Sequence, residues 1–255
     1  LYERAYAGIL ARARSSRLKF ALLEHAARLG WQQFEAERGR IPGFGLIRRG
    51  LWSVLDRIAG VKVRAGFGGR LRVAVTGGAP LQLQVARFLI GLGVPIVEGY
   101  GLTETAPVVA ANGIEDNLPG SVGYPVEGVE VKLSEQGELL VRSSSMMLGY
   151  WQAPEATADC LDREGWLRTG DFAELKEGRL FIKGRLKELI VLSTGKKVLP
   201  TAVEAAIPKN PLFDNVLVVG EQRPHLSAIL VINRERWSTL TRDSGIDVED
   251  LDHQQ

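Results

Sequence analysis

One stretch constrains the fold of this 255-residue chain more than any other. Between Leu71 and Gly101, a predicted strand, a glycine turn, a helix and a second strand follow one another. The run "LRVAVTGGAP" stops at a double glycine, "LQLQVARFLIGLG" has apolar residues at helical spacing, and "VPIVEGYG" is typical of a buried strand. We expect Pro80 in the first turn of the helix. Since a helical crossover joins parallel strands, the sequence predicts a parallel α/β core here.

The segments on either side predict other structures. Residues 1–60 have apolar residues three or four apart, which predicts amphipathic helices, broken at "GRIPGFG" and ending at Gly60. Residues 61–118 contain the α/β unit. Residues 119–183 alternate apolar and polar residues between "EQG", "DREG" and "KEG" turns, which predicts an antiparallel, barrel-like module. After it, "TAVEAAIPKN" predicts a short helix, "FDNVLVVGEQ" with "HLSAILVIN" a strand pair, and the acidic tail a frayed end. The expected fold class is mixed α/β.

Composition excludes several kinds of site. No apolar run approaches the ~20 residues of a bilayer span. A single cysteine, Cys160, excludes an internal disulfide and fits a reducing compartment such as the cytoplasm. One cysteine and three scattered histidines also exclude a zinc site of the Cys/His kind.

Charge is distributed unevenly along the chain. Residues 1–72 carry 15 Lys and Arg against 5 Asp and Glu, while the whole chain has a net charge of only +2. Such a basic segment is either a solvated helix face or a surface for an anionic partner, including a membrane that it touches peripherally. These charges lack the interleaved aromatic residues of a nucleic-acid platform, so we expect no nucleic-acid partner.

Two glycine-spaced motifs are expected at the carboxyl ends of the two core strands: "TGGAP" (Thr76–Pro80) and "EGYGLTET" (Glu98–Thr105). Ligands collect at such strand ends in open α/β sheets, where glycines let the backbone approach them. Tyr100 offers a flat face for stacking, Thr103 a hydroxyl for a phosphate oxygen, and Glu104 a hard oxygen ligand for Mg²⁺. Glycine spacing alone is weak evidence, because "AGFGG" has it too, so a plain tight turn remains an alternative.

Two later motifs add polar groups. In "GWLRTGD", Asp171 follows Thr-Gly at an expected strand end, where a carboxylate can accept two hydrogen bonds from ribose hydroxyls. In "GRLKELIVLSTGKKVLP", the guanidinium of Arg185 could reach a ribose or a phosphate. Either motif alone could be a turn with a salt bridge.

In this order and at these spacings, the motifs resemble those of the adenylate-forming superfamily, which contains acyl-CoA synthetases, luciferases and peptide-synthetase adenylation domains. The segments that carry the resemblance are "TGGAP", "EGYGLTET", "PGSVGYP", "GELLVRSSSMMLGYW", "GWLRTGD" and "GRLKELIVLSTGKKVLP", between about residues 70 and 235. The basic helical segment before them resembles the long-chain fatty acyl-CoA synthetase branch. The resemblance implies that residues 1–183 belong to the large AMP-binding domain and residues 184–255 to the small C-terminal domain.

The resemblance also implies a nucleotide site. Its expected members are Gly77, Gly78, Ala79, Pro80, Gly99, Tyr100, Gly101, Asp171 and Arg185. Tyr100 would stack on adenine, and Asp171, supported by Arg185, would bind the ribose hydroxyls. Thr103 and Glu104 would be the catalytic residues, holding the α-phosphate and Mg²⁺ respectively.

Two further residues receive roles from the resemblance. Lys187 falls at the family's hinge, about which the small domain swings, and Gly195 on the loop that approaches the CoA channel. The implied reaction uses ATP and Mg²⁺ to convert a fatty carboxylate to an acyl-adenylate, which CoA then attacks through its thiol. Such a site must position reactants and neutralise phosphate charge more than transfer protons.

Two family motifs do not occur in the chain: the phosphate loop ending in Pro-Lys-Gly and the catalytic lysine near the C-terminus. "STGKK" (Ser193–Lys197) is superficially similar to the loop but follows the ribose motifs. We therefore expect a central-to-C-terminal piece of a larger synthetase that by itself does not activate fatty acids. Two alternatives remain open: a fatty acyl-AMP ligase that loads a carrier protein, and a non-catalytic nucleotide-binding module.

Overall fold

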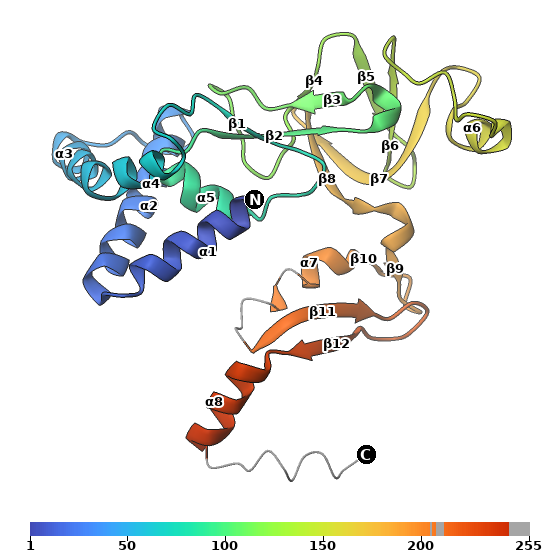
Figure 1. The fold of residues 1–255 in the computed structure, drawn as a ribbon. Coiled ribbons are helices and arrows are strands. Elements are labelled where there is room, and N and C mark those ends of the chain that lie inside the picture. The colour runs from blue at the N-terminus through green and yellow to red at the C-terminus, as the bar shows by residue number, and fades with distance from the viewer. Residues whose placement is uncertain (205, 208–211, 245–255) are drawn as a thin grey trace. The chain divides into compact units, whose positions relative to one another are not determined.

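The computed structural model describes residues 1–204, 206–207 and 212–244. It divides the chain into two compact units (Figure 1). Unit 1 comprises Leu1–Thr169 and Ala173–Ile182, and unit 2 comprises Gly170–Phe172 and the chain from Lys183 onward. Helices and several sheets make the fold mixed α/β, as predicted.

Unit 1 begins with the predicted helices. They are α1 (Tyr2–Ala13), α2 (Arg17–Glu37), α3 (Leu46–Leu55), a single π-helical turn η1 (Asp56–Gly60) and α4 (Val61–Gly66). The expected end at Gly60 is wrong, because Gly60 has right-handed helical dihedrals, φ −61° and ψ −47°. Its role is close packing: a Cβ on Gly60 would lie 2.1 Å from Oδ1 of Asp56, which accepts a hydrogen bond from Arg64 at 2.6 Å.

Two glycines let α2 pack against α5 (Leu83–Gly91). A Cβ on Gly30 would lie 1.8 Å from the carbonyl oxygen of Gly91, and a Cβ on Gly91 would lie 2.0 Å from that of Ala27. The backbones of the two helices therefore touch where they cross. Around this crossing, apolar residues of α5 and of the strands beside it, such as Leu89 and Ile96, form a buried core.

The first sheet contains the predicted strand–helix–strand unit. Its order is β1 (Ala74–Thr76), β2 (Ile96–Gly101), β3 (Val108–Ala111) and β4 (Tyr124–Pro125). Strands β1 and β2 are parallel, which confirms the predicted core, and the other two pairs are antiparallel. The expected place of Pro80 is wrong: α5 begins at Leu83, with Gln82 as its N-cap, so Pro80 lies in the loop before the helix.

The predicted β-rich segment forms the second sheet, in the order β5 (Val129–Leu133), β6 (Glu138–Ser143), β7 (Leu167–Lys176) and β8 (Arg179–Arg185). The segment is not β throughout, because α6 (Pro154–Cys160) interrupts it. Pro154 lies in the first turn of that helix, where a missing amide hydrogen costs nothing. In unit 1, Gly123 and Leu180 form an isolated antiparallel bridge that links the loop before β4 to β8.

Unit 2 contains the predicted strand pair, β11 (Phe213–Val219) antiparallel to β12 (Ser227–Ile232). It also contains a short hairpin of β9 (Ile190–Val191) and β10 (Lys197–Val198), then α7 (Pro200–Glu204) and α8 (Arg234–Ser244). The helix predicted for "TAVEAAIPKN" is confirmed as α7, although residues 205 and 208–211 lie outside the described residues. The predicted frayed tail beyond Ser244 also lies outside them.

Candidate functional site

The two glycine motifs lie side by side in unit 1. Thr76, the last residue of β1, pairs with Glu98 in the register of the parallel strands. One residue further on, a Cβ on Gly77 would lie 3.3 Å from the carbonyl oxygen of Gly99. Glycine thus leaves the backbone of both motifs accessible at the carboxyl ends of neighbouring strands, the edge at which open α/β sheets bind ligands.

The "TGGAP" loop exposes its backbone rather than its side chains. Residues 77–80 are all exposed, and Gly78 has φ +75°, a left-handed conformation that glycine adopts without strain. Because α5 begins only at Leu83, the loop amides do not lie at a helix N-terminus. The loop and the start of the chain, including Tyr2, line a cavity of about 390 Å³. What the loop offers a planar ligand is a set of backbone donors and acceptors.

The second motif ends in a closed turn. After β2, the residues Thr103–Thr105 form a 3₁₀ turn, η2. The hydroxyl of Thr105 is buried; it donates to the carbonyl oxygens of Leu102 and Pro107, at 2.9 Å each, and accepts the Leu102 amide at 3.1 Å. Gly101 is required sterically, because a Cβ there would lie 1.6 Å from the Pro107 oxygen. The closed turn leaves the Thr103 side chain exposed.

The carboxylate of Glu104 lies half-buried at the same turn. The hydroxyl of Tyr150 donates to its Oε1 at 2.7 Å, and this hydrogen bond is the main reason why the pKa of Tyr150 rises to about 12. Among the described residues, no group of three or more His, Cys, Asp or Glu side chains could hold a metal ion. A single carboxylate nevertheless fits Mg²⁺, which takes most of its ligands from phosphates and water when it accompanies a nucleotide.

Tyr100 lies on β2 opposite Ala110 of β3. Its ring is half-buried and packs against the apolar cluster that contains Val109, Leu139 and Leu180. A ring supported by a close-packed core loses little freedom when a ligand stacks on its accessible part.

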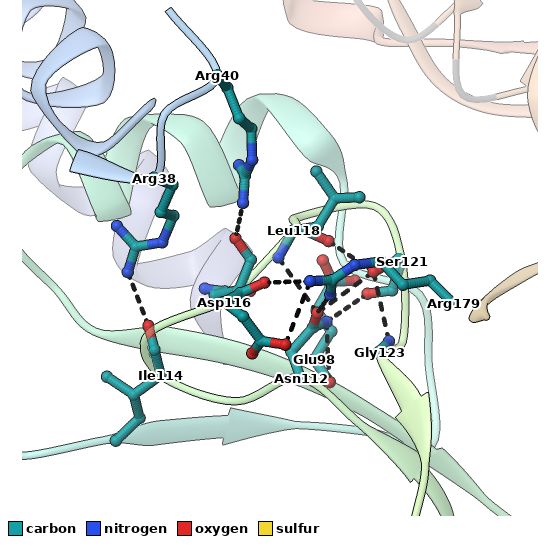
Figure 2. Close-up of polar contacts among 11 residues, drawn as sticks. Arg38, Arg40, Glu98, Asn112, Ile114, Asp116, Leu118, Ser121, Gly123 and Arg179 are labelled. Carbon is teal, nitrogen blue, oxygen red and sulfur yellow. Dashed lines mark hydrogen bonds and ion pairs between the residues drawn. The ribbon is translucent and has the colours of Figure 1, made fainter. Parts of the chain in front are cut away.

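The first residue of the second motif, Glu98, is buried in a polar network (Figure 2). Its Oε1 accepts the Gly120 amide at 2.8 Å, and its carbonyl oxygen accepts the Asn112 amide at 3.0 Å. Burial raises the pKa of Glu98, and the hydrogen bond from Gly120 opposes that rise only in part. Asn112 also donates through Nδ2 to the Ser121 carbonyl at 2.6 Å.

Three arginines extend this network by donating hydrogen bonds to the loop between β3 and β4 (Figure 2). Arg179 donates to Oδ1 of Asn112 at 3.3 Å and to the Asp116 carbonyl at 2.8 Å, and it pairs with the Asp116 carboxylate at 3.2 Å. Arg38 and Arg40, which follow α2, donate to the carbonyl oxygens of Ile114 and Asn117 respectively. The network holds this loop against β2, at Ile96 and Glu98. Sequence reasoning missed it, although the run "NGIEDNLPGS" held the polar residues that form it.

In unit 2, Asp171 and Arg185 form an ion pair, with 3.2 Å between Nε and Oδ1. Asp171 is 5% exposed. The prediction that Asp171 ends a strand is wrong, because β7 continues to Lys176. Gly170, with φ +70°, introduces a local irregularity rather than an end. Arg185 is the last residue of β8.

The other two predicted residues also lie in unit 2. Lys187 is exposed on the 3₁₀ turn Leu186–Glu188. Gly195 is exposed in the turn between β9 and β10, where its φ of +80° favours glycine, and its amide donates to the Leu192 carbonyl at 2.8 Å. Both are accessible, and neither contributes to the core of the unit.

Two family models match the chain. The model of the AMP-binding enzyme covers residues 22–151, and the model of the AMP-binding enzyme C-terminal domain covers residues 187–249. The chain belongs to the AMP-binding enzyme family. This membership confirms the superfamily resemblance identified in the sequence motifs.

Curated relatives of the chain include fatty-acid ligases. The chain is 38% identical over 237 residues to long-chain-fatty-acid–CoA ligase FadD15 of Mycobacterium bovis, covering 91% of this chain and 38% of the relative. It is 34% identical over 186 residues to the chloroplastic long-chain-fatty-acid–[acyl-carrier-protein] ligase AEE15 of Arabidopsis thaliana, covering 64% and 26% respectively. The chain therefore spans well under half the length of these relatives.

Solved structures show the same fold. The chain matches O-succinylbenzoate coenzyme A synthetase (MenE) from Bacillus subtilis, in complex with ATP and magnesium ion. The TM-score is 0.57 at 25% identity, over 68% of this chain and 40% of the synthetase chain. None of the helices in the described ranges has both the length and the apolar character that a membrane crossing requires.

Most of the predicted site residues lie in unit 1. Nine of them gather at the β1–β2 edge of unit 1: Gly77, Gly78, Ala79, Pro80, Gly99, Tyr100, Gly101, Thr103 and Glu104. Asp171 and Arg185 form a pair in unit 2, where Lys187 and Gly195 lie on separate turns.

Proposed function

We propose that this chain is part of a long-chain fatty acid–CoA ligase, an AMP-forming enzyme that activates the acid with ATP. The observation that supports the proposal is the close approach of Gly77 to Gly99: a Cβ on Gly77 would lie 3.3 Å from the Gly99 carbonyl oxygen, where the two parallel strands end. The names of the curated relatives, 38% and 34% identical, support the substrate class. A reducing compartment such as the cytoplasm suits the single cysteine.

Each residue of the strand edge has a role in this proposal. The backbone of the "TGGAP" loop binds the edge of adenine, and the ring of Tyr100 stacks on its face. The exposed hydroxyl of Thr103 donates to an α-phosphate oxygen, and the carboxylate of Glu104 holds Mg²⁺. The ion supplies charge neutralisation on the phosphates. The residues themselves orient the α-phosphate toward the attacking carboxylate, so positioning and electrostatics provide the rate enhancement.

The residues of unit 2 have complementary roles. We propose that Asp171 accepts hydrogen bonds from the ribose hydroxyls and that the ion pair with Arg185 orients this carboxylate. Lys187 is the proposed hinge residue, and Gly195 belongs to the loop that approaches CoA. Residues 1–183 are then part of the large domain and residues 184–255 part of the small one.

Pyrophosphate exchange tests the activation step in the protein that carries this chain. We expect palmitate to stimulate ATP–pyrophosphate exchange, and Glu104→Gln to reduce the rate at least ~100-fold, as loss of transition-state charge stabilisation does. Glu115→Gln, at an exposed glutamate of the β3–β4 loop, is the matched control and should leave the rate unchanged. Absence of exchange with every fatty acid, in a folded protein, would favour the non-catalytic nucleotide-binding module.

The acyl acceptor is proposed to be CoA rather than a carrier protein. FadD15 is named as a CoA ligase and AEE15 as an acyl-carrier-protein ligase, and the chain is more similar to the first. Preformed palmitoyl-adenylate offered to CoA and to a phosphopantetheinylated carrier protein separates the two acceptors. Faster thioester formation on the carrier protein than on CoA would contradict the proposal that CoA is the acceptor.

A second proposal concerns peripheral membrane contact through the basic helices. Five apolar residues, three or four apart along α3, η1 and α4, are each 44% exposed or more: Ile47, Leu51, Val54, Ile58 and Val61. Exposed cations accompany this stripe at Arg49, Arg57 and Lys62. An apolar stripe with cationic neighbours suits the surface of an anionic bilayer.

Co-sedimentation with vesicles tests the membrane proposal. We expect the chain to sediment with phosphatidylglycerol vesicles more than with phosphatidylcholine vesicles. The double variant Ile47→Ser, Ile58→Ser should lose this binding. Equal sedimentation with both vesicles, or no effect of the serine substitutions, would favour a solvated helix face.

A further inference from the structure

The motif "GELLVRSSSMMLGYW" supports the family resemblance, but the proposed function gives none of its residues a role. In the structure, the segment that follows β6 crosses the turn η2 that carries Thr103 and Glu104. Three hydrogen bonds join them. Ser145 Oγ donates to the Thr105 carbonyl at 2.9 Å, the Met147 amide to the Glu104 carbonyl at 2.8 Å, and Tyr150 Oη to Glu104 Oε1 at 2.7 Å.

The backbone of Tyr150 is itself held in place. Its amide donates to Oγ1 of Thr157 at 2.9 Å, and this hydroxyl donates to the Ala153 carbonyl at 2.9 Å in the first turn of α6. Gly149 permits the approach: its φ is +147°, and a Cβ there would lie 2.9 Å from Cγ2 of Thr157. The phenol of Tyr150 is therefore presented to Glu104 from a tethered backbone.

We propose that Tyr150 is a positioning residue for Glu104, holding its carboxylate in the orientation in which it binds the Mg²⁺ that accompanies ATP. This inference rests on the proposed function, since it assigns Glu104 to the metal. An ionised carboxylate has about four lone-pair sites. One hydrogen bond to Oε1 thus restricts the side chain while leaving capacity for a cation.

The backbone hydrogen bonds set the position of the turn, and the phenol sets the side chain. Met147 and Ser145 donate to main-chain oxygens of the turn, so they fix where residues 104 and 105 lie. The Tyr150 hydroxyl instead donates to the Glu104 carboxylate itself. Removing that hydroxyl should weaken the binding of Mg²⁺ in the presence of ATP. It should leave the binding of AMP without metal unchanged.

Calorimetric titration of Tyr150→Phe tests the inference, with Tyr124→Phe as the matched control. Tyr124 is also exposed, on β4, and its ring packs under Arg179 at 4.3 Å. We expect Tyr150→Phe to raise the apparent dissociation constant of Mg²⁺, measured at fixed ATP, three- to tenfold. Its affinity for AMP without metal should change less than twofold, and its melting temperature should stay that of the wild type. Tyr124→Phe should change neither affinity.

A double-mutant cycle separates positioning from a general effect on the site. In the Glu104→Gln background, Tyr150→Phe should alter the Mg²⁺-ATP affinity less than twofold, because the neutral amide is a much weaker magnesium ligand than the carboxylate. An unchanged or lower Mg²⁺ constant in Tyr150→Phe would overturn the inference; a lower constant would show that the phenol competes with the cation. A wild-type chain that binds neither AMP nor Mg²⁺-ATP would contradict the proposed function and this inference together. If the wild type binds AMP and Mg²⁺-ATP and Tyr150→Phe has the same Mg²⁺ affinity, only the inference about Tyr150 is contradicted.

Discussion

A methyl group on Gly77 would lie 3.3 Å from the carbonyl oxygen of Gly99. The two glycines belong to different motifs, and the parallel register of β1 and β2, with Thr76 opposite Glu98, brings them together. Their close approach places backbone groups of the loop after β1 next to those of the last residues of β2. The adjacent turn adds the side chains of Thr103 and Glu104 to that edge.

The turn that presents Thr103 and Glu104 depends on Gly101. We expect Gly101→Ala to lower the free energy of unfolding by about 3 kcal/mol or more, because its Cβ would overlap the Pro107 carbonyl at 1.6 Å. Urea unfolding measures the loss. Gly50→Ala is the control: a methyl group on Gly50, in α3, would have no other atom within 4 Å, so alanine should stabilise by about 0.5–1 kcal/mol. Equal stability of Gly101→Ala and the wild type would contradict the required close approach.

The raised pKa of Glu98 predicts that the stability of the fold depends on pH. Burial raises its pKa in the folded chain above the ordinary value of 4.5, so the folded state binds its proton more tightly than the unfolded state. The contribution of Glu98 to stability is therefore fully present below pH 4.5 and falls as the pH rises through the raised pKa.

Glu98→Gln removes this titration while its amide oxygen can still accept the Gly120 amide. We expect the variant to gain stability relative to the wild type as the pH rises from 4.5 toward neutrality. Urea unfolding of both proteins across that range measures the difference. A difference that is constant with pH, or that changes in the opposite direction, is incompatible with a raised pKa.

The proposed role of Asp171 predicts that the chain prefers nucleotides that carry both ribose hydroxyls. Two hydrogen bonds to a carboxylate, each worth about 1.5–3 kcal/mol, should make the wild type bind AMP at least ~100-fold more tightly than 2′,3′-dideoxy-AMP. In Asp171→Ala the two nucleotides should bind with equal affinity. Asp159→Ala, at an exposed residue of α6, should keep the wild-type ratio. A wild type that does not distinguish the two nucleotides would remove Asp171 from the ribose site.

Turn residues and hydrophobic periodicity in the sequence predicted which segments form helices and strands. The double glycine before a helical period predicted the parallel pair β1–β2, and two neighbouring apolar runs predicted β11 paired with β12. The residues at which helices begin and end were harder to predict. Pro80 favours a first helical turn, yet the helix begins at Leu83, and Gly60 continues a helix because Asp56 and Arg64 pack against it.

Contacts between residues distant in sequence were not predictable from one chain. The bond from Tyr150 to Glu104 spans 46 residues, and that from Arg179 to Asn112 spans 67. Polar residues in loops carry no periodicity that would reveal such partners. Asp171 was placed at a strand end because Thr-Gly resembles a turn, whereas the alternating burial of β7 continues through it.

Binding of AMP tests the central claim most directly, and saturation-transfer NMR can detect it even when it is weak. Irradiation of the protein should attenuate the adenine H2 and H8 signals of AMP in the presence of the wild-type chain. Tyr100→Phe should retain the effect, because the aromatic face remains, while Tyr100→Ala should lose most of it. Absence of transfer to adenine from the wild type at millimolar AMP, or equal transfer from Tyr100→Ala, would contradict a nucleotide site at the β1–β2 edge.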